Sequence, residues 1–529
     1  MGNDTTMSPV NGKGFQVNKI ISNRICGRKR RIERRLDKFN YPEDMSQPVM
    51  GRQDLKFELG GRAVATPCGG LALVHQFVQQ VGLPDEIDGR VQLFKTHLPY
   101  HESDHVLNLA YNVLCGGTCL EDLELRRQDE AYLNALGAER IPDPTTAGDF
   151  CRRFTAAGLD SLHAAFDAVR LKIWGQQPRE FFDEARIEAD GTMVETDAEC
   201  KEGIDISYNG VWGYHPLLVT LANTGEVLRL VNRPGNRPSH EGAATQLDQC
   251  VALCREAGFR RILLRGDTDF SQTEHLDGWH EQGVTFIFGM DVTTLKHMHA
   301  DDLPKKAWEI LERPERPEPK TKPRSRPPRV KQQIVEERGF KDIRLVNELV
   351  AEMPYRPHAC RHDYRLIIVR KNLVVSEPRQ LRLFNDYRYF IYITNDVEMS
   401  PRDVVLSAND RCHQENIIAQ LKSLRSLHSP VDNLTSNHAY MLITSLAWNL
   451  KAWMALWLPA PPGRWQQRHR EEKRRLLQME FRTFLNYWIL LPCQVLRTGR
   501  RIVLRVLAYN QWQPVFFRLA QHVSRPLRC

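Results

Sequence analysis

The chain contains 529 residues, which is too long for one ordinary hydrophobic core and therefore predicts two to four domains. With 42% apolar and 26% charged residues, its composition is typical of a soluble globular protein. Its 73 basic residues exceed its 65 acidic residues by only 8, but they cluster in residues 19–38 and 464–475. Such runs suit contact with a phosphate backbone, although a disordered, solubilising segment would explain either run equally well.

The cysteines argue against a disulfide-stabilised or zinc-binding protein, and the apolar stretches argue against a secreted or membrane-spanning one. The 12 cysteines include no Cys-x-x-Cys pair, so we expect reduced thiols in a cytosolic protein and no disulfide framework or zinc site. The N-terminus has no apolar signal core. The most apolar stretch, residues 441–459, contains Asn449 and Lys451, which favours a buried helix over a membrane span.

The first third of the chain divides into a basic arm and a helical region. Residues 1–60 lack periodicity and are expected to be a disordered arm, whereas residues 61–178 show apolar stripes at helical spacing. Asp143 and Pro144 mark the start of a helix that carries Arg152 and Arg153. We expect this region, and the helix over residues 146–154 in particular, to bind DNA, but a plain helical bundle would give the same pattern.

Residues 179–295 change to a pattern of short strands. Strands are predicted at 185–190, 216–222, 226–232, 261–265 and 284–289, with helices at 242–257 and 272–282. The order of strand, two-stranded hairpin, helix, strand, helix and strand predicts the mixed sheet of a ribonuclease H-like core, in the α/β (α+β) class. In that order, the ends of the first and fourth strands lie next to each other.

The remaining residues are expected to form an insertion and a helical end. Residues 296–400 combine a proline-rich segment at 304–329, predicted to be irregular, with strands at 364–370 and 387–394. Helices resume near Ser407, which with Asp410 resembles a capping box. Residues 401–460 would supply the last core helices, including one over 434–458. Residues 461–529 would form a basic helical C-terminal region, with a helix over 470–490.

Three carboxylates on separate elements form the candidate site. Asp190 and Asp267 each end a strand beside a glycine, and Glu415 lies on an amphipathic helix far downstream. Each alone has an ordinary explanation as a turn or solvated residue. Asp269 is an alternative to Asp267, which we favour because it directly follows the strand and Gly266. Phosphodiester chemistry needs little more than two divalent ions roughly 4 Å apart held by carboxylates, so these acids predict a magnesium site.

Two cations share a face with Glu415. Arg411 precedes it by four residues and Lys422 follows it by seven, so at about 100° per residue all three fall within a narrow helical sector. An acid between two cations suits a metal ligand flanked by phosphate contacts. An ordinary salt-bridged helix face would explain Arg411 and Glu415 as well.

These motifs together resemble those of a known family. On Ala189-Asp190-Gly191-Thr192, on the run from Leu264 to Phe270, and on Arg411-x3-Glu415-x6-Lys422, the chain resembles DDE transposases of bacterial insertion sequences. It is most similar to the thirteen-eighty family of the insertion-sequence-four superfamily, over residues 70–458. The superfamily's last motif has a tyrosine three residues before the arginine, where this chain has Ala408.

The resemblance implies a function and its partners. Asp190, Asp267 and Glu415 would hold two Mg²⁺ ions, which Mn²⁺ could replace, and Arg411 and Lys422 would bind phosphate. The enzyme would be a DNA transposase that cleaves and transfers strands at terminal inverted repeats, as a homodimer on double-stranded DNA in the bacterial cytoplasm. Some relatives flip a base onto a tryptophan, a role open to Trp308, although packing is the favoured explanation. An inactive DNA-binding derivative and a ribonuclease H-like nuclease are the alternatives.

Overall fold

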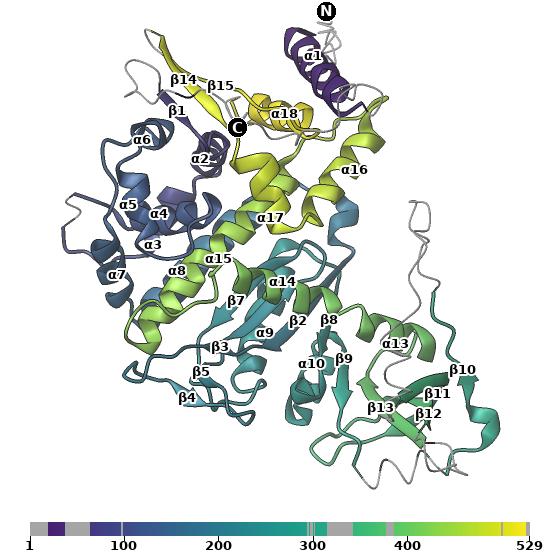
Figure 1. Ribbon diagram of the computed structural model, residues 1–529. Coiled ribbons are helices and arrows are strands. Elements are labelled where there is room, and N and C mark those ends of the chain that lie inside the picture. The colour runs from purple at the N-terminus through teal and green to yellow at the C-terminus, as the bar shows by residue number, and fades with distance from the viewer. Residues whose placement is uncertain are drawn as a thin grey trace, which may run out of the picture.

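The structure, a computed structural model, describes residues 19–37, 55, 64–96, 99–293, 296, 300, 302–314, 342–376, 386–498 and 501–524. It is a mixed α/β fold in which helices surround one nine-stranded sheet (Figure 1). None of the helices in these parts of the chain is long and apolar enough to cross a membrane.

The region after residue 70 is helical, as its periodicity predicts. Asp143 caps one of these helices, because its Oδ1 accepts a hydrogen bond from the Thr146 N–H at 2.9 Å. In the same helix Arg152 binds Asp432, and the neighbouring Arg153 lies over the ring of Phe94. The helices are α2 (Leu71–Val81), α3 (Leu83–Arg90), α4 (Glu102–Leu114), α5 (Asp122–Arg127), α6 (Glu130–Leu136), α7 (Pro144–Arg152) and α8 (Ala156–Trp174).

The centre of the molecule is a five-stranded part of the sheet in the order β9-β8-β2-β6-β7. Its strands are β2 (Glu184–Gly191), β6 (Leu217–Leu221), β7 (Glu226–Val231), β8 (Arg261–Gly266) and β9 (Thr285–Met290). Strands β8 and β9 run parallel to β2, whereas β6 runs antiparallel to both β2 and β7. This order and these directions confirm the strand arrangement predicted from the sequence.

Helices cover both faces of this sheet. Alternate residues of β2 point to opposite faces, so Ala185, Ile187 and Ala189 are buried in the main core, which also includes residues of α9 (Ala243–Ala257) and α10 (Thr273–Glu281). A small separate sheet, in the order β3-β5-β4, follows β2 in the chain. Its strands are β3 (Val194–Glu195), β4 (Asp205–Ile206) and β5 (Trp212–Tyr214).

A buried carboxylate joins the helical region to the sheet. Glu226, at the start of β7, accepts hydrogen bonds from Arg170 (3.1 Å), Trp174 (3.0 Å), Thr224 (2.6 Å) and Trp453 (2.7 Å). Arg170 and Trp174 belong to α8, and Trp453 belongs to α15 (Leu434–Trp457), the buried helix predicted from the apolar stretch. Because the Glu226 side chain is fully buried, these four hydrogen bonds offset the free-energy cost of removing its carboxylate from water.

The insertion continues the central sheet. Strand β13 (Asp386–Thr394) pairs with β9, and β12 (Tyr364–Ser376), β11 (Asp342–Tyr355) and β10 (Glu309–Ile310) follow outward in turn. Two of these strands were predicted, whereas β11 and β10 were missed. The prediction that residues 304–329 are irregular is wrong at its start, because Lys305–Ala307 form a 3-10 turn and β10 pairs with β11. Residues 315–329 lie outside the described residues.

Helix α13 (Pro401–Asn409) packs on the insertion and leads into α14 (Cys412–Ser423). The predicted capping box at Ser407 is wrong. The helix begins earlier, because Ser400 accepts a hydrogen bond from the Asp403 N–H and Pro401 occupies the first turn. Ser407 therefore lies inside α13.

The two ends of the chain differ most from expectation. The C-terminal region is not wholly helical, because β14 (Cys493–Thr498) pairs with β15 (Arg501–Val506) and with β1 (Val64–Thr66). The helix predicted over 470–490 is divided into α16 (Gln466–Leu477), α17 (Phe481–Phe484) and a π-helical turn (Leu485–Ile489); α18 (Gln513–Val523) follows.

Part of the expected disordered arm is a helix, α1 (Lys19–Leu36), which corrects that prediction. It lies against the C-terminal region (Figure 1), where Arg28 donates hydrogen bonds to the carbonyls of Val506 and Ala508, and Ile25 is buried. These contacts come from residues almost 500 positions away, so no local pattern reveals them. The rest of the arm lies outside the described residues, apart from Leu55.

Candidate active site

Two of the predicted acids lie at the same edge of the sheet. Strands β2 and β8 are parallel neighbours, and Glu188 is the partner of Arg265 in their register. Asp190 and Asp267 each follow two residues after this pair, so the two aspartates are level with each other. The sequence prediction that these two strand ends are adjacent is confirmed.

Asp267 is held by the turn that follows β8. Its Oδ1 accepts a hydrogen bond from the Asp269 N–H at 3.0 Å, and the 3-10 turn Thr268–Phe270 begins there. The chain passes close to β9 at this point. A Cβ on Gly289 would lie 2.8 Å from the Thr268 nitrogen, so only glycine lets β9 approach the turn. Asp269 is exposed, whereas Asp267 is half-buried and directly follows β8, which favours Asp267 as the second acid.

A buried glutamine places the helix that carries Glu415. Gln414 is fully buried and its Nε2 donates to the carbonyl oxygens of Glu188 at 3.1 Å and Leu218 at 3.3 Å. These carbonyls belong to β2 and β6, so the first turn of α14 is fixed directly above the strand that ends in Asp190. Glu415 is the next residue, and its side chain is exposed. In the sequence, Gln414 has no feature that distinguishes it from a solvent-exposed polar residue of the helix.

A buried ion pair joins the two strands just before the acids. Glu188 and Arg265 are each 1% exposed and form a salt bridge between β2 and β8. Arg265 also donates to the Ser407 carbonyl at 2.6 Å and lies 3.5 Å from Asp410. Because these partners lie on α13 and just after it, one guanidinium holds β8, β2 and the approach to α14 together. The sequence analysis also missed this pair, although Glu and Arg within otherwise buried strands are a usable signal.

The two predicted phosphate-binding cations lie beside the carboxylates. Arg411 Nη2 is 3.8 Å from Asp267 Oδ2, and its Nη1 is buried without a hydrogen-bond partner. Lys422 is influenced by the charge of Asp190 and Glu195, while burial lowers its pKa. Arg411 therefore lies at the acidic site, and Lys422 lies near enough for the charge of Asp190 to influence its pKa.

The pKa values of the two aspartates reflect their burial and the negative charges around them. Burial raises the pKa of Asp190 to about 6, Arg411 lowers it, and the neighbouring Asp267 and Glu415 raise it again. Burial also raises the pKa of Asp267, against the opposing effect of Arg411. One arginine does not neutralise three carboxylates, so a cation is favoured between them.

The donor atoms fit a hard divalent cation. Carboxylate oxygens are the ligands that Mg²⁺ prefers, and it usually binds through one or two of them and keeps several waters. Within the described residues, no three His, Cys, Asp or Glu side chains already surround a common point. Glu415 would have to turn toward the aspartates to complete a set of three.

A histidine packs against the glycine that follows Asp190. The His215 Nδ1 lies 2.6 Å from the Arg237 carbonyl oxygen, and a Cβ on Gly191 would lie 2.8 Å from the ring Nε2. Since the carbonyl accepts, Nδ1 carries the proton and Nε2 is the free acceptor beside the site. The Asp-Gly pair is thus explained by a close approach of a side chain.

The remaining sequence candidates have ordinary surroundings. Ala408, in the position of the missing tyrosine, packs against a small apolar cluster formed by residues of the central sheet, the insertion and α13. Trp308 packs partly buried in the insertion, with the Arg370 guanidinium 4.1 Å from its ring centroid. This environment agrees with the packing explanation that the sequence analysis favoured for Trp308.

A comparison with protein-family models identifies the family. Residues 47–526 match the model of the transposase DDE domain, group 1. The chain belongs to this family of DDE transposase domains. Since the match spans most of the chain, the insertion and the C-terminal region belong to the family's domain as well as the acid-bearing core. No curated protein matches this DDE transposase.

Among solved structures, one similar protein is a piggyBac transposase, determined by cryo-EM in a synaptic complex with hairpin DNA. The two chains are 11% identical and superpose with a TM-score of 0.31, over 80% of this chain and 84% of that chain. At this identity, no residue role is transferred from that structure.

Proposed function

We propose that the protein is an active transposase, with a ribonuclease H-like core that cleaves DNA at the ends of its own insertion sequence and joins them to a target. The observation that carries this proposal is the level placement of Asp190 and Asp267 on adjacent parallel strands, with the α14 helix of Glu415 anchored above them. Membership of the DDE transposase family supports the same reaction class.

Asp190, Asp267 and Glu415 are the proposed ligands of two Mg²⁺ ions, which Mn²⁺ can replace. When bound, such ions supply charge neutralisation at the scissile phosphate and lower the pKa of a bound water. The raised pKa of Asp190 and Asp267 in the metal-free protein agrees with a site built to receive positive charge. Arg411 sits beside Asp267 and is proposed to hold the phosphate on one side, with Lys422 on the other.

The chemistry consists of two in-line displacements at phosphorus. In the first, a water oxygen attacks the phosphodiester at the transposon end, and the bond to the 3′ oxygen breaks to release a 3′ hydroxyl. In the second, that hydroxyl attacks a phosphodiester of the opposite strand or of the target, and a new strand junction replaces the broken bond. Negative charge grows on the equatorial oxygens in both steps, where fixed cations such as Arg411 are most effective.

The finer assignment follows the motif resemblance. We propose a bacterial enzyme of the insertion-sequence-four superfamily, close to the thirteen-eighty family, that acts in the cytoplasm as a homodimer which pairs two terminal inverted repeats on double-stranded DNA. The domain limits proposed from sequence, at residues 60, 178, 295, 400 and 460, are kept as working boundaries. Ala408 removes one expected phosphate contact, which we expect to weaken end binding while leaving the acids in place.

Strand cleavage of the element's terminal repeats, with Mg²⁺ or Mn²⁺, tests the proposal. Asp190→Ala, Asp267→Ala and Glu415→Ala should each abolish cleavage while DNA binding persists, and Asp269→Ala should retain it as a matched control. Unchanged cleavage in all three alanine variants would overturn the acid assignment. DNA binding without cleavage by the wild-type protein, with either metal, would instead indicate an inactive derivative.

A further inference from the structure

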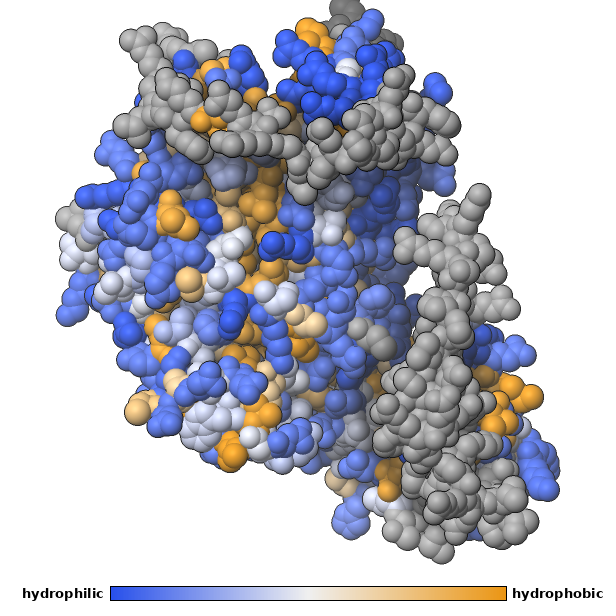
Figure 2. All heavy atoms as spheres, in the orientation of Figure 1, coloured by the Kyte–Doolittle hydropathy of each residue, from blue (hydrophilic) through white to orange (hydrophobic). Residues whose placement is uncertain are grey.

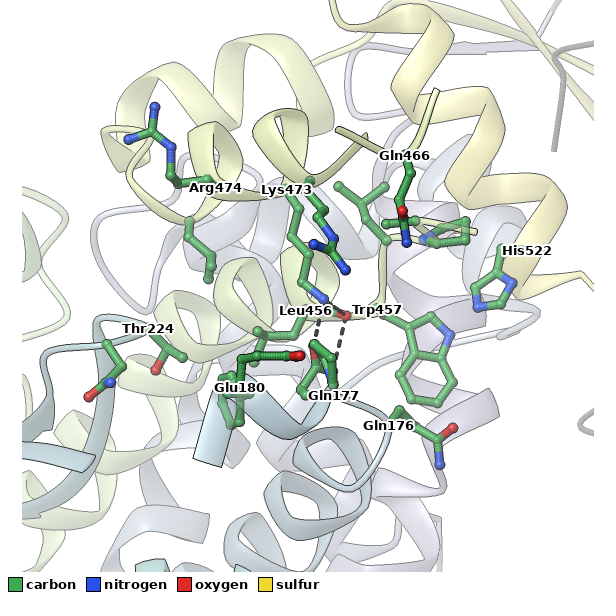
Figure 3. A pocket seen from close by; sticks show the side chains of 18 of the residues that line it. Gln176, Gln177, Glu180, Thr224, Leu456, Trp457, Gln466, Lys473, Arg474 and His522 are labelled. Atoms are coloured by element: carbon green, nitrogen blue, oxygen red, sulfur yellow. Dashed lines mark hydrogen bonds between the residues drawn. The ribbon is translucent and has the colours of Figure 1, made fainter. Parts of the chain in front are cut away.

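A large cavity of the described structure lies away from the carboxylates. It has a volume of about 1440 Å³ and opens where the end of α8, the start of β2, the end of α15 and the helix α16 meet (Figure 3). Arg186 of β2 lines it. Arg186 and Asp190 share a face of β2 four residues apart, so the cavity and the acids are separated by roughly 13 Å along the strand.

The cavity is positively charged. Arg186, Arg470, Lys473 and Arg474 line it, against the single acid Glu180. Arg474 is paired with Glu471, and Arg186 lies 3.5 Å from Glu184 and 3.7 Å from Asp410, but Arg470 forms no ion pair within the described residues. The wall therefore carries more positive charge than its own acids neutralise.

Lys473 is the deepest of these cations. Its Nζ donates to Gln177 Oε1 at 2.5 Å and to the Leu456 carbonyl at 2.8 Å. Gln177 Nε2 donates to the same carbonyl at 3.2 Å, and Figure 3 marks these contacts with dashed lines. Both acceptors are neutral, and burial lowers the pKa of this amine to about 8. An ammonium group can donate three hydrogen bonds, so one donor remains for a ligand.

A second unsatisfied donor lines the same cavity. Trp457 is 7% exposed, and its indole Nε1–H is buried without a hydrogen-bond partner. A buried donor without an acceptor costs roughly 1–3 kcal/mol. Trp457 thus adds an unsatisfied donor to the wall of a cavity in which Lys473 keeps one donor free.

The positive surface extends along α16 beyond the cavity. A second hollow, of about 730 Å³, shares Arg470 and Arg474 with the first and adds Trp465, which is 43% exposed. The guanidinium groups of Arg464 and Arg468 lie 5.0 and 5.8 Å from the Trp465 ring centroid. A small anion would need one hollow, whereas two connected ones on a basic helix suit a polymer of phosphates.

We propose that α16 and the cavity beneath it bind the phosphate backbone of a DNA segment, with Lys473 and Arg470 contacting phosphate groups. The identity of the polymer rests on the proposed function, whereas the binding of phosphate rests on the cavity itself. The exposed basic residues of α1 form a further hydrophilic patch at the top of Figure 2.

Salt-dependent DNA binding by the full-length protein tests this proposal. Fluorescence anisotropy with a 30-base-pair duplex is measured in EDTA, so that cleavage plays no part. Lys473→Met should weaken binding about tenfold at moderate salt. It should also reduce the slope of log Kd against log salt by about 1, as expected for one lost phosphate contact. Arg470→Ala should act similarly, and Lys473→Arg should restore most of the affinity.

Arg356→Ala is the matched control, because Arg356 is an exposed arginine that follows β11 in the insertion, where it pairs with Asp363. Its slope should equal that of the wild type, and thermal unfolding midpoints show whether each variant is folded. If folded Lys473→Met and Arg470→Ala bind DNA with unchanged slope, the proposal is wrong. If inorganic pyrophosphate binds wild type and not Lys473→Met while DNA binding is unaffected, the cavity holds a small anion and the DNA assignment is overturned. Failure of cleavage alone, with these slopes as expected, would contradict only the proposed function.

Discussion

Replacing Asp190 with asparagine should stabilise the metal-free protein at alkaline pH. The native site raises the pKa of this carboxyl to about 6 from an ordinary value of 3.8. The native state therefore holds a proton that the unfolded chain has already released. The stability that this proton contributes is fully present below about pH 4 and is lost as the pH rises through about 6. The shift corresponds to about 3 kcal/mol, which is the cost of the buried charge at pH 8.

Urea denaturation in EDTA, at pH 4 and at pH 8, measures this cost. Asp190→Asn should raise the free energy of unfolding by up to about 3 kcal/mol at pH 8, with little gain at pH 4, and Asp269→Asn should stay within about 0.5 kcal/mol at both. Added Mg²⁺ should stabilise the wild type and leave Asp190→Asn unaffected, because ligand binding to the native state alone is stabilising. An Asp190→Asn variant that is less stable than wild type at pH 8 in EDTA would refute this reasoning.

Three other substitutions test the supports of the site. Arg265→Met should destabilise the protein by about 3–5 kcal/mol in urea denaturation, because it leaves Glu188 buried and unpaired, while Glu188→Leu combined with Arg265→Met should recover much of that loss. Gln414→Leu should lower kcat for cleavage more than it weakens DNA binding, since the helix of the third acid loses its two hydrogen bonds to the sheet; equal loss of both would indicate general unfolding. Gly191→Ala should reduce cleavage at least tenfold, because its Cβ would meet the His215 ring, and removing the ring in Gly191→Ala/His215→Ala should recover part of the rate.

The central part of the fold could be predicted because its pattern is local. Strand alternation, the turn at Thr224 and the helix between β7 and β8 determine an order, and the right-handed connection of parallel strands leaves few alternatives. That order places Asp190 beside Asp267 without any knowledge of the rest of the chain. Glu415 was selected by its spacing from Arg411 and Lys422, which holds because all three lie at or within α14.

The supports of the site could not be predicted in the same way. Gln414 looks like any polar helix residue, and only the long-range packing of α14 on β2 shows that it is buried. The helix α1 was read as a disordered arm because its stabilising contacts come from Val506 and Ala508 at the other end of the chain. The hairpin of β14 and β15 was missed because mixed basic and apolar residues give no clear period of two or 3.6.

The insertion shares its backbone hydrogen bonds with the strand next to Asp267, and this has a mechanical consequence. Strand β13 pairs with β9, which in turn pairs with β8, while α13 connects the outer strands to α14. A force that displaces the outer strands would be transmitted to Asp267 through β9 and β8, and to Glu415 through α13 and α14. A partner that binds β11 or β12 could thus change the distance between Asp267 and Glu415 without contacting either residue.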